Sequence, residues 1–401
     1  MMLQNSIRSF TRQNNFVPVT ASINFLCNNL TAPRKRGTHP PVLEGTQQMK
    51  QQYTIAELAT KLDTLENEKR DFVLDTRKMN FEHMGDTGAA LIFNDEAFEI
   101  NDIAHSQICA NLGVPKKYYD RMRADAPHLL ENNVNHWLAS EPSKRMVRTV
   151  CNGSNTARAW LSDRYRRIDN YAIAQAALPV LSELPEVRIE STALTEKRMH
   201  IKAVLPQVQA EVKVGDVVQA GISISNSEVG HGAVSVSMFI YRLICKNGMS
   251  VPGAGSRTNH IGRHVGTSED VYELYSDEAM QADDAALMLK IRDLVRGAAN
   301  DLKFNDIVNK MRDAAASSRI SDPVGAVEEL GRKFIMPEVE QRGILSHLIE
   351  GGDLSAYGML NAVTRFSQDV DSYERATELE NIGGQILDLR QGEWRELATA
   401  A

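Results

Sequence analysis

The chain has 401 residues, enough for one large domain or two to three ordinary ones. Hydrophobic residues make up 42% and charged residues 24%, and the mean hydropathy is -0.33, which is typical of a folded globular protein and excludes wholesale disorder. The formal charge of -7 argues against a protein that coats nucleic acid by bulk electrostatics.

Residues 1–48 differ in composition from the rest of the chain. They are rich in Asn, Thr, Ser and Pro, show no sustained apolar period, and hold Arg8, Arg12, Arg34, Lys35 and Arg36 against the single acid Glu44. This composition predicts a poorly ordered leader. A transit-like peptide is one interpretation, but Met49 before a helical segment favours an upstream extension from a misplaced start codon.

Residues 49–140 are predicted to be a mainly helical N-terminal part. Thr54 is a suitable N-cap for a helix with apolar residues at helical spacing. Short strands are expected at 89–93 and 97–100, followed by a helix that ends at Gly113.

Residues 141–266 are predicted to form an antiparallel β centre with one helix, at 170–184. A tight turn is predicted at Asn152-Gly153-Ser154-Asn155, because Asn and Gly tolerate positive φ. This turn predicts a hairpin. The expected strand pairs are 146–151 with 156–161, 187–192 with 199–205, and 217–225 with 233–245.

Residues 267–401 are predicted to be an α-helical C-terminal region. An apolar stripe runs from Leu287 to Leu302, Asp322-Pro323 is a helix start, and Gly351-Gly352 separates two helices. The fold class is therefore α+β: a central antiparallel β-sheet built from hairpins, between a helical N-terminal part and an α-helical C-terminal tail.

The apolar runs are too short for a membrane protein. The longest candidate, 233–245, is interrupted by Ser235, Ser237 and Arg242, so no membrane partner is expected. The four cysteines are scattered and form no C-x-x-C pair, which favours a reducing compartment and a cytoplasmic location.

A basic concentration surrounds the first hairpin, with Asp163 the only acid between Lys144 and Arg167. Cations for phosphates and aromatic rings for base stacking are what a single-stranded nucleic-acid groove needs. The predicted nucleic-acid-binding residues here are Arg148, Arg158, Trp160, Arg164, Tyr165, Arg166 and Arg167. The competing interpretation, an exposed charged face with aromatics turned into the core, is at least as strong.

A second stretch, 229–268, contains no Asp or Glu. Arg242 and Lys246 add to the predicted nucleic-acid surface. The Gly-rich segment 252–266 is expected to be a loop that can wrap an anion with backbone N–H groups, or else an ordinary surface loop. The residues assigned to this anion-binding loop are Arg257, His260, Arg263 and His264.

Catalytic and metal chemistry have little support. His260 and His264 have ligand-like spacing, but Gly262 between them breaks the helical face they would share, so no metal is expected. Cys245 ends an apolar strand and is interpreted as a packing residue. Neither a P-loop nor a complete dinucleotide fingerprint occurs, so no cofactor and no catalytic residue are assigned.

Several blocks carry a family resemblance. The segments 159–166 (AWLSDRYR), 224–230 (ISNSEVG), 241–249 (YRLICKNGM) and 361–366 (NAVTRF), with Arg263-His264, resemble the family called domain of unknown function 932. The resemblance covers most of the chain after Met49. It implies a protein of phages, plasmids and other bacterial mobile elements, often near recombination and replication genes, and it supplies no catalytic residue.

We therefore expect a mobile-element accessory protein that is DNA-associated and binds single strands in recombination, repair or replication. Element order also resembles, by analogy alone, that of single-strand annealing proteins. The expected partners are single-stranded DNA and, as an open alternative, further copies of the chain. Two other functions stay open: an enzyme acting on a phosphorylated or nucleic-acid substrate at the Gly/Arg/His loop, and an interaction protein acting against host defence.

Overall fold

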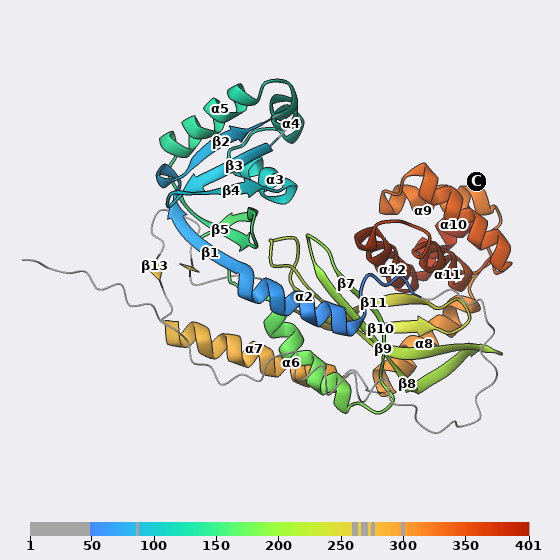
Figure 1. Ribbon diagram of the computed structural model, residues 1–401. Helices are drawn as coiled ribbons and strands as arrows, with labels where there is room; N and C mark the ends of the chain where they lie inside the picture. Colours follow the sequence, from blue (N-terminus) through green and yellow to red (C-terminus); the bar gives the residue numbers. More distant parts are fainter. Residues whose placement is uncertain are drawn as a thin grey trace, which may run out of the picture.

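The computed structural model describes residues 49–85, 88–258, 264–265, 272–273, 277–297 and 301–400. It has an α+β fold with two larger sheets, shown in Figure 1. The predicted fold class is confirmed. The leader 1–48 lies outside the described residues, and so do His260 and Arg263.

A six-stranded sheet occupies the N-terminal part, with strand order β1-β5-β6-β4-β3-β2. All neighbours are antiparallel except β4 and β6, which are parallel. Its strands are β1 (Lys69–Asp75), β2 (Asn80–Met84), β3 (Gly88–Phe93), β4 (Glu96–Ile100), β5 (Lys144–Cys151) and β6 (Asn155–Ser162), with the 3-10 turn η1 (Thr76–Lys78) after β1. The predicted first hairpin is present as β5 and β6, whereas the prediction missed β1 and β2.

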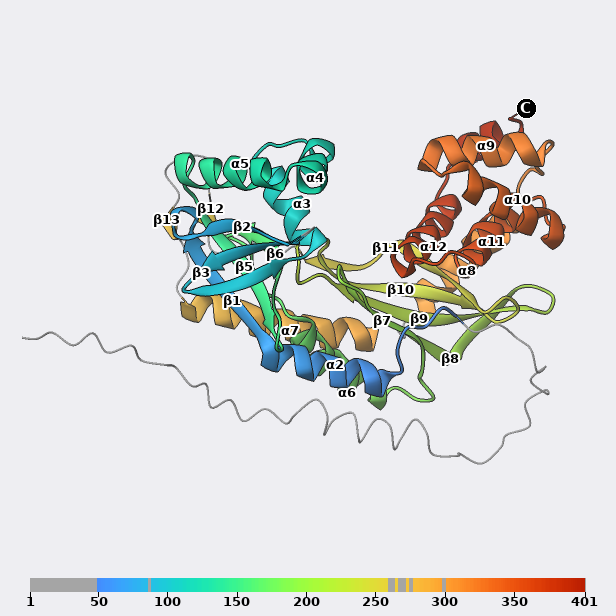
Figure 2. The same ribbon diagram turned by 45° about the horizontal axis from the view of Figure 1, so that its top comes forward.

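Three helices cover one face of this sheet, at the top of Figure 2. They are α3 (Asp102–Asn111), α4 (Lys116–Asp125) and α5 (Pro127–Ser140). Between β3 and β4, Asn94 and Asp95 both have positive φ, which is the geometry of a tight type I′ turn. The core beneath the helices contains Phe81, Phe98 and Trp160.

A second, five-stranded antiparallel sheet follows, in the order β11-β10-β9-β8-β7. Its strands are β7 (Arg188–Leu194), β8 (Met199–Lys213), β9 (Asp216–Asn226), β10 (Val234–Arg242) and β11 (Asn247–Thr258). The sequence predicted one β centre, and the structure divides it after β6. Hairpin patterns specify local pairs, but they do not say which pairs share a sheet.

Residues 252–258 of the Gly-rich segment predicted as a loop are in fact the second half of β11. Gly255 pairs with Ser237, and a Cβ on Gly255 would lie 2.3 Å from the Val236 carbonyl oxygen. Glycine is therefore required by close strand approach, a use that sequence alone does not separate from loop flexibility. A short pair, β12 (His264–Val265) with β13 (Tyr272–Glu273), follows.

The apolar face of the five-stranded sheet packs on helices that lie below it in Figure 2. These are α2 (Ile55–Glu68), α6 (Asn170–Glu183) and α7 (Asp277–Gly297). Thr54 and Glu57 form the capping box that begins α2, which confirms Thr54 as the N-cap. Ile201, Ile222 and Val236 belong to this core.

The remaining helices form the C-terminal region at the other end of the second sheet. They are α8 (Asp301–Ala315), α9 (Pro323–Phe334), α10 (Glu338–Gly351), α11 (Ala356–Phe366), α12 (Tyr373–Leu387) and α13 (Gln391–Ala398). Both α11 and α12 contact β11. None of the helices within the described ranges combines the length and hydropathy needed to span a membrane.

We predict that His105 on α3 makes stability sensitive to acid. The side chain is fully buried, its Nδ1 lies 2.8 Å from the Tyr119 hydroxyl, and burial lowers its pKa to about 3. Between about pH 6.5 and about pH 3 the unfolded chain therefore binds a proton that the folded chain does not, so the free energy of unfolding falls by up to about 1.4 kcal/mol per pH unit as pH drops.

Urea unfolding across this pH range measures the effect. His105→Gln should flatten the slope, whereas His136→Gln, at an exposed position on α5, should leave it unchanged. Equal slopes for wild type and His105→Gln would contradict the assignment.

Candidate functional site

Arg148 lies fully buried where the two sheets meet. Its side chain is 1% exposed and makes a bidentate ion pair with Asp71, the residue directly opposite on β1 (2.9 and 3.1 Å). A third bond reaches Asp169, the residue before α6, at 2.5 Å, and a fourth reaches the backbone oxygen of Glu228 at 3.1 Å. One guanidinium thus joins the first sheet to α6 and to the connection between β9 and β10.

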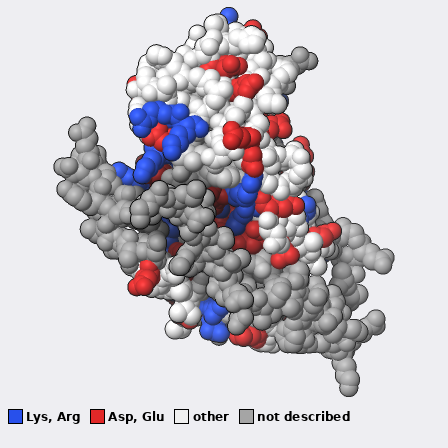
Figure 3. Space-filling view, turned by 60° about the vertical axis from the view of Figure 1, so that its left-hand side comes forward, with Lys and Arg blue, Asp and Glu red and all other residues white. Residues whose placement is uncertain are grey.

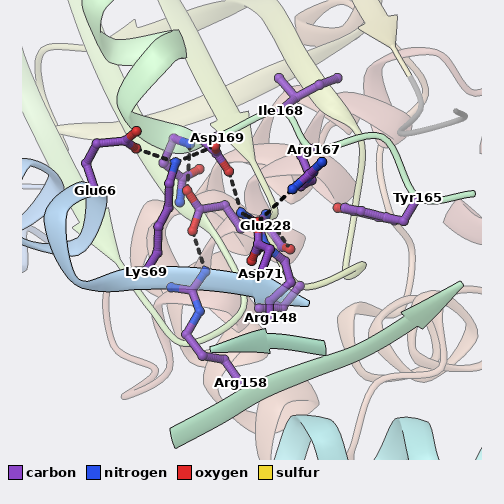
Figure 4. Close-up of polar contacts among 12 residues, drawn as sticks. Glu66, Lys69, Asp71, Arg148, Arg158, Tyr165, Arg167, Ile168, Asp169 and Glu228 are labelled. Carbon is purple, nitrogen blue, oxygen red and sulfur yellow. Dashed lines mark hydrogen bonds and ion pairs between the residues drawn. The ribbon is translucent and has the colours of Figure 1, made fainter. Parts of the chain in front are cut away.

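Further charges surround Arg148, as Figure 4 shows. Lys69 binds Glu66 and Asp169, both at 2.5 Å, and Arg158 binds Glu228 at 2.5 Å. We call this set the junction cluster: Glu66, Lys69, Asp71, Arg148, Arg158, Arg167, Asp169 and Glu228. Its four cations and four carboxylates balance one another.

The titration of the junction cluster is dominated by burial and by these ion pairs. Burial by itself would raise the pKa of the Asp169 carboxyl, but Arg148 and Lys69 hold that pKa well below its usual range. Burial raises the pKa of Glu66 against the pull of Lys69. The cluster therefore keeps Asp169 ionised as the counter-charge of Arg148.

The first hairpin does not present its predicted basic residues as one open groove. Trp160 is 3% exposed and donates from Nε1 to Asn111 at 3.0 Å, and the Tyr165 hydroxyl donates to the backbone oxygen of Ser227. Arg166 is 9% exposed and pairs with Asp283 and Asp284 on α7.

The other two arginines of the hairpin region remain nearer the surface. Arg164 is half-buried, and Arg167 is half-exposed with Asp71 3.9 Å away. Around this hairpin Trp160 therefore packs in the core, as the competing interpretation expected. The exposed charged face of that interpretation is not formed as a whole, because Arg148 and Arg166 are buried in ion pairs.

Arg242 and Lys246 lie at the far end of the second sheet, away from the first hairpin. Arg242 forms a bidentate pair with Asp216 (2.8 and 2.7 Å), which also accepts a bond from the Tyr357 hydroxyl. Lys246 occupies the turn between β10 and β11 with positive φ. Arg257 and His264 lie on β11 and β12, but their side chains are outside the described part.

Charges of both signs adjoin on the surface as well. On the described part of the face in Figure 3, Lys and Arg side chains stand beside Asp and Glu and do not form one continuous basic field. Phosphate binding at this junction by charge density alone is therefore weakly supported.

The polar face of the second sheet contains a cavity of about 560 Å³ between β8–β11 and α12, which we call the hydroxyl cavity. Its lining is Arg198, His200, Ser223, Ser225, Ala233, Ser235, Ser237, Ser250, Val251, Gly255, Ser256, Thr377, Asn381 and Gln385. No Asp or Glu occurs among these described lining residues.

The register of the strands and the period of α12 determine which side chains line the hydroxyl cavity. His200 lies opposite Ser225, and Ser225 lies opposite Ser235, so the three form one row across the sheet. On α12, Thr377, Asn381 and Gln385 recur every four residues and therefore share one helix face. A polar helix face and a polar sheet face thus enclose a space that side chains do not fill.

A second cavity of about 570 Å³, the junction cavity, lies between α2, the first hairpin and the β7–β8 turn. Its charged lining residues are Lys61, Glu68, Arg158, Glu196, Lys197, Arg198 and Glu228. Arg198 lines both cavities, and its Nε donates to the His231 backbone oxygen at 2.7 Å. A Cβ on Gly232 would lie 2.6 Å from the Arg198 guanidinium, so glycine makes room for this cation.

A third cavity of about 370 Å³, the edge cavity, lies between β10, β11, α7 and the start of α8. It shares Ser237, Gly255 and Ser256 with the hydroxyl cavity, and Lys290 and Lys303 lie in its wall with Asp293. Neighbouring cavities therefore share walls: Arg198 stands between the junction and hydroxyl cavities, and Ser237, Gly255 and Ser256 stand between the hydroxyl cavity on the α12 side of the sheet and the edge cavity on the α7 side.

Sequence reasoning missed most of this site. It identified Arg158 but assigned no role to Arg198, to His200 or to the serines of β9 and β10. The available signal was the Val-Ser-Val-Ser alternation with small hydroxyls instead of long charged side chains. Among the described residues no group of three or more metal-ligating side chains occurs.

We predict that Arg148→Met destabilises the protein by about 3 to 5 kcal/mol, because it leaves Asp71 and Asp169 buried without their main counter-charge. Denaturant unfolding measures the loss. Arg121→Met on α4, where the arginine is 77% exposed, is the control and should change stability by less than about 0.5 kcal/mol. A similar small change for Arg148→Met would show that the junction cluster does not hold the sheets together.

Comparison with known families gives a match. The model of the family described as domain of unknown function (DUF932) matches residues 158–383, more than half of the chain. Comparison with curated proteins and with solved structures gives no significant match. The matched region contains β7–β11 and most of α12. Of the cavity linings, Gln385 of the hydroxyl cavity and the junction-cavity residues that precede Arg158 lie outside it. The chain belongs to the DUF932 family.

Proposed function

We propose that the chain binds single-stranded DNA along the path formed by the junction, hydroxyl and edge cavities. The observation that carries this proposal is their contiguity: Arg198 connects the first two, and Ser237, Gly255 and Ser256 connect the last two. A path of adjoining polar cavities suits an extended ligand with repeating groups better than a single small molecule.

The charges along this path suit a polyanion. Exposed lysines stand at both ends, Lys61 and Lys197 at the junction cavity and Lys290 and Lys303 at the edge cavity. The acids of the path also lie in those two cavities, whereas the middle, the hydroxyl cavity, has only Arg198 and His200 as ionisable lining. Phosphates bound at both ends would exchange counterions for lysine ammonium groups.

The shape and chemistry of the path favour an unpaired strand. Cavities of about 370 to 570 Å³ are of the size that takes small organic groups, and they leave no room for a duplex. Serine hydroxyls and the Asn381 and Gln385 amides can hydrogen-bond to phosphates, sugars and base edges. At the junction end, Tyr53 offers an aromatic ring with Lys61 4.8 Å from its centre.

The biological role in this proposal follows the family resemblance. It is that of a cytoplasmic accessory protein of a phage, plasmid or integrated element, acting on single strands in recombination, repair or replication. The support for this role comes from family membership and from the chemistry of the path.

Fluorescence anisotropy with a labelled oligothymidylate tests the proposal. Wild type should bind with an affinity that falls steeply between about 50 and about 200 mM salt. The double variants Lys61→Ala/Lys197→Ala and Lys290→Ala/Lys303→Ala should each weaken binding, and each should reduce the log-log salt slope by about 0.7 for every phosphate that a lysine no longer neutralises.

The matched control is Arg342→Ala on α10, a cation that is 73% exposed and is not among the lining residues of the three cavities. Its salt slope should equal that of wild type. Failure of wild type to bind any single strand at low salt would refute the proposal. Weaker binding in only one of the two lysine variants would confine the site to one cavity and favour the alternative of an enzyme acting on a smaller phosphorylated substrate.

A further inference from the structure

The hydroxyl cavity contains polar atoms that the protein itself leaves unsatisfied. The His200 side chain is 1% exposed, yet neither ring nitrogen has a hydrogen-bond partner among the described residues. The buried Oγ1 of Thr377, across the cavity on α12, also has none. Buried polar groups without partners cost stability, and most native proteins avoid them.

His200 stands among charged groups from several elements. Glu374 on α12 has an oxygen 3.6 Å from His200 Nε2, beyond hydrogen-bond distance, and the Tyr373 ring lies 5.1 Å from the imidazole. Arg198, in the β7–β8 turn, and Lys202, on β8, flank it, and Lys202 is itself paired with the buried Glu380. Burial, with Lys202 and Arg198, lowers the pKa of His200 although Glu374 raises it.

An anion in the cavity would satisfy both groups at once. A phosphate oxygen accepts hydrogen bonds from an imidazole N–H, from serine and threonine hydroxyls and from a guanidinium, all of which line this space. No Asp or Glu occurs in the described lining, so the repulsion on a bound phosphate would come mainly from Glu374 beside His200 and would be opposed by Arg198.

We infer that the hydroxyl cavity is a phosphate-binding subsite in which His200, Thr377 and Arg198 contact the phosphate group. As a part of the path this inference rests on the proposed function, which supplies the phosphate from a DNA backbone. A free nucleotide or inorganic phosphate offers the same chemistry. The subsite can therefore be tested with small probes apart from strand binding.

Thr377→Val provides the sharpest test, because it removes a hydroxyl that has no partner among the described residues. Its thermal midpoint should be unchanged or higher than that of wild type. Calorimetric titration with the dinucleotide TpT, with thymidine 5′-monophosphate and with inorganic phosphate should nevertheless show weaker binding, by about threefold to tenfold for the removal of one hydrogen bond.

His200→Gln tests the imidazole. We expect affinity for the same probes to fall about tenfold to a hundredfold, as for a hydrogen bond to a charged group. Because burial lowers the pKa of His200, the imidazole stays neutral near neutral pH and would donate to the phosphate as an N–H. TpT has no titrating phosphate near neutral pH, so its affinity for wild type should not change through His200 between pH 6 and pH 8. Thr399→Val on the exposed end of α13 is the control for both affinity and stability.

The outcomes separate the two proposals. Binding of the small probes without binding of oligothymidylate would retain the subsite and refute the strand path. Binding of oligothymidylate with unchanged affinity in Thr377→Val and His200→Gln would retain the path and refute the subsite. Absence of binding for all three small probes, or a lowered midpoint of Thr377→Val with unchanged affinity, would also overturn the subsite.

Discussion

The burial of the Arg148 guanidinium is the constraint on which the arrangement of the two sheets depends. A cation removed from water needs carboxylates around it, and Asp71, Asp169 and the Glu228 backbone provide its partners from three separate elements. The β9–β10 connection, which contains Glu228, continues to His231, whose backbone oxygen accepts a hydrogen bond from Arg198. The position of Arg198 between two cavities is thus linked, through this connection, to the buried Arg148 at the interface of the sheets.

The second sheet differs from an ordinary two-layer arrangement in how its faces are covered. Its apolar face packs on α2, α6 and α7, and this packing supplies hydrophobic stabilisation. On its other face Val204, Phe239 and Tyr241 form a small apolar cluster with Met49. Beyond that cluster this face presents hydroxyls and His200 to the polar side of α12. The space is preserved because the helix is held elsewhere, partly by the buried pair of Lys202 with Glu380.

Helix starts and tight hairpins were predictable from the sequence where a few neighbouring residues determine them. Thr54 with Glu57 specified the start of α2, and Asn152-Gly153 specified the first hairpin. The division into two sheets was not predictable, because β1 pairs with β5 across some 70 residues and no short motif records that pairing. The assignment of Gly255 to a loop failed for a related reason, since its role is set by a neighbouring strand.

The candidate site was less predictable than the fold. Arginines around the first hairpin suggested phosphate contacts, but charge along a sequence does not reveal that Asp71, Glu228 and Asp283 lie beside them in space. From the sequence alone, the serines of β9 and β10 indicate strands whose alternate side chains face solvent. The structure shows that α12 covers these serines. What distinguishes the cavity is a relation between a strand and a helix about 150 residues apart.

The place where the family match begins has a consequence for how the DUF932 region should be understood. Residue 158 lies in the middle of β6, which pairs with β5 on one side and β4 on the other. A polypeptide limited to residues 158–383 would carry half of an inner strand whose two neighbours are missing, and it would lack the Arg148 end of the junction cluster. Its exposed strand edge would invite association between chains. In this chain the matched region therefore shares a sheet and the junction cluster with residues upstream of it, as far back as Glu66 on α2.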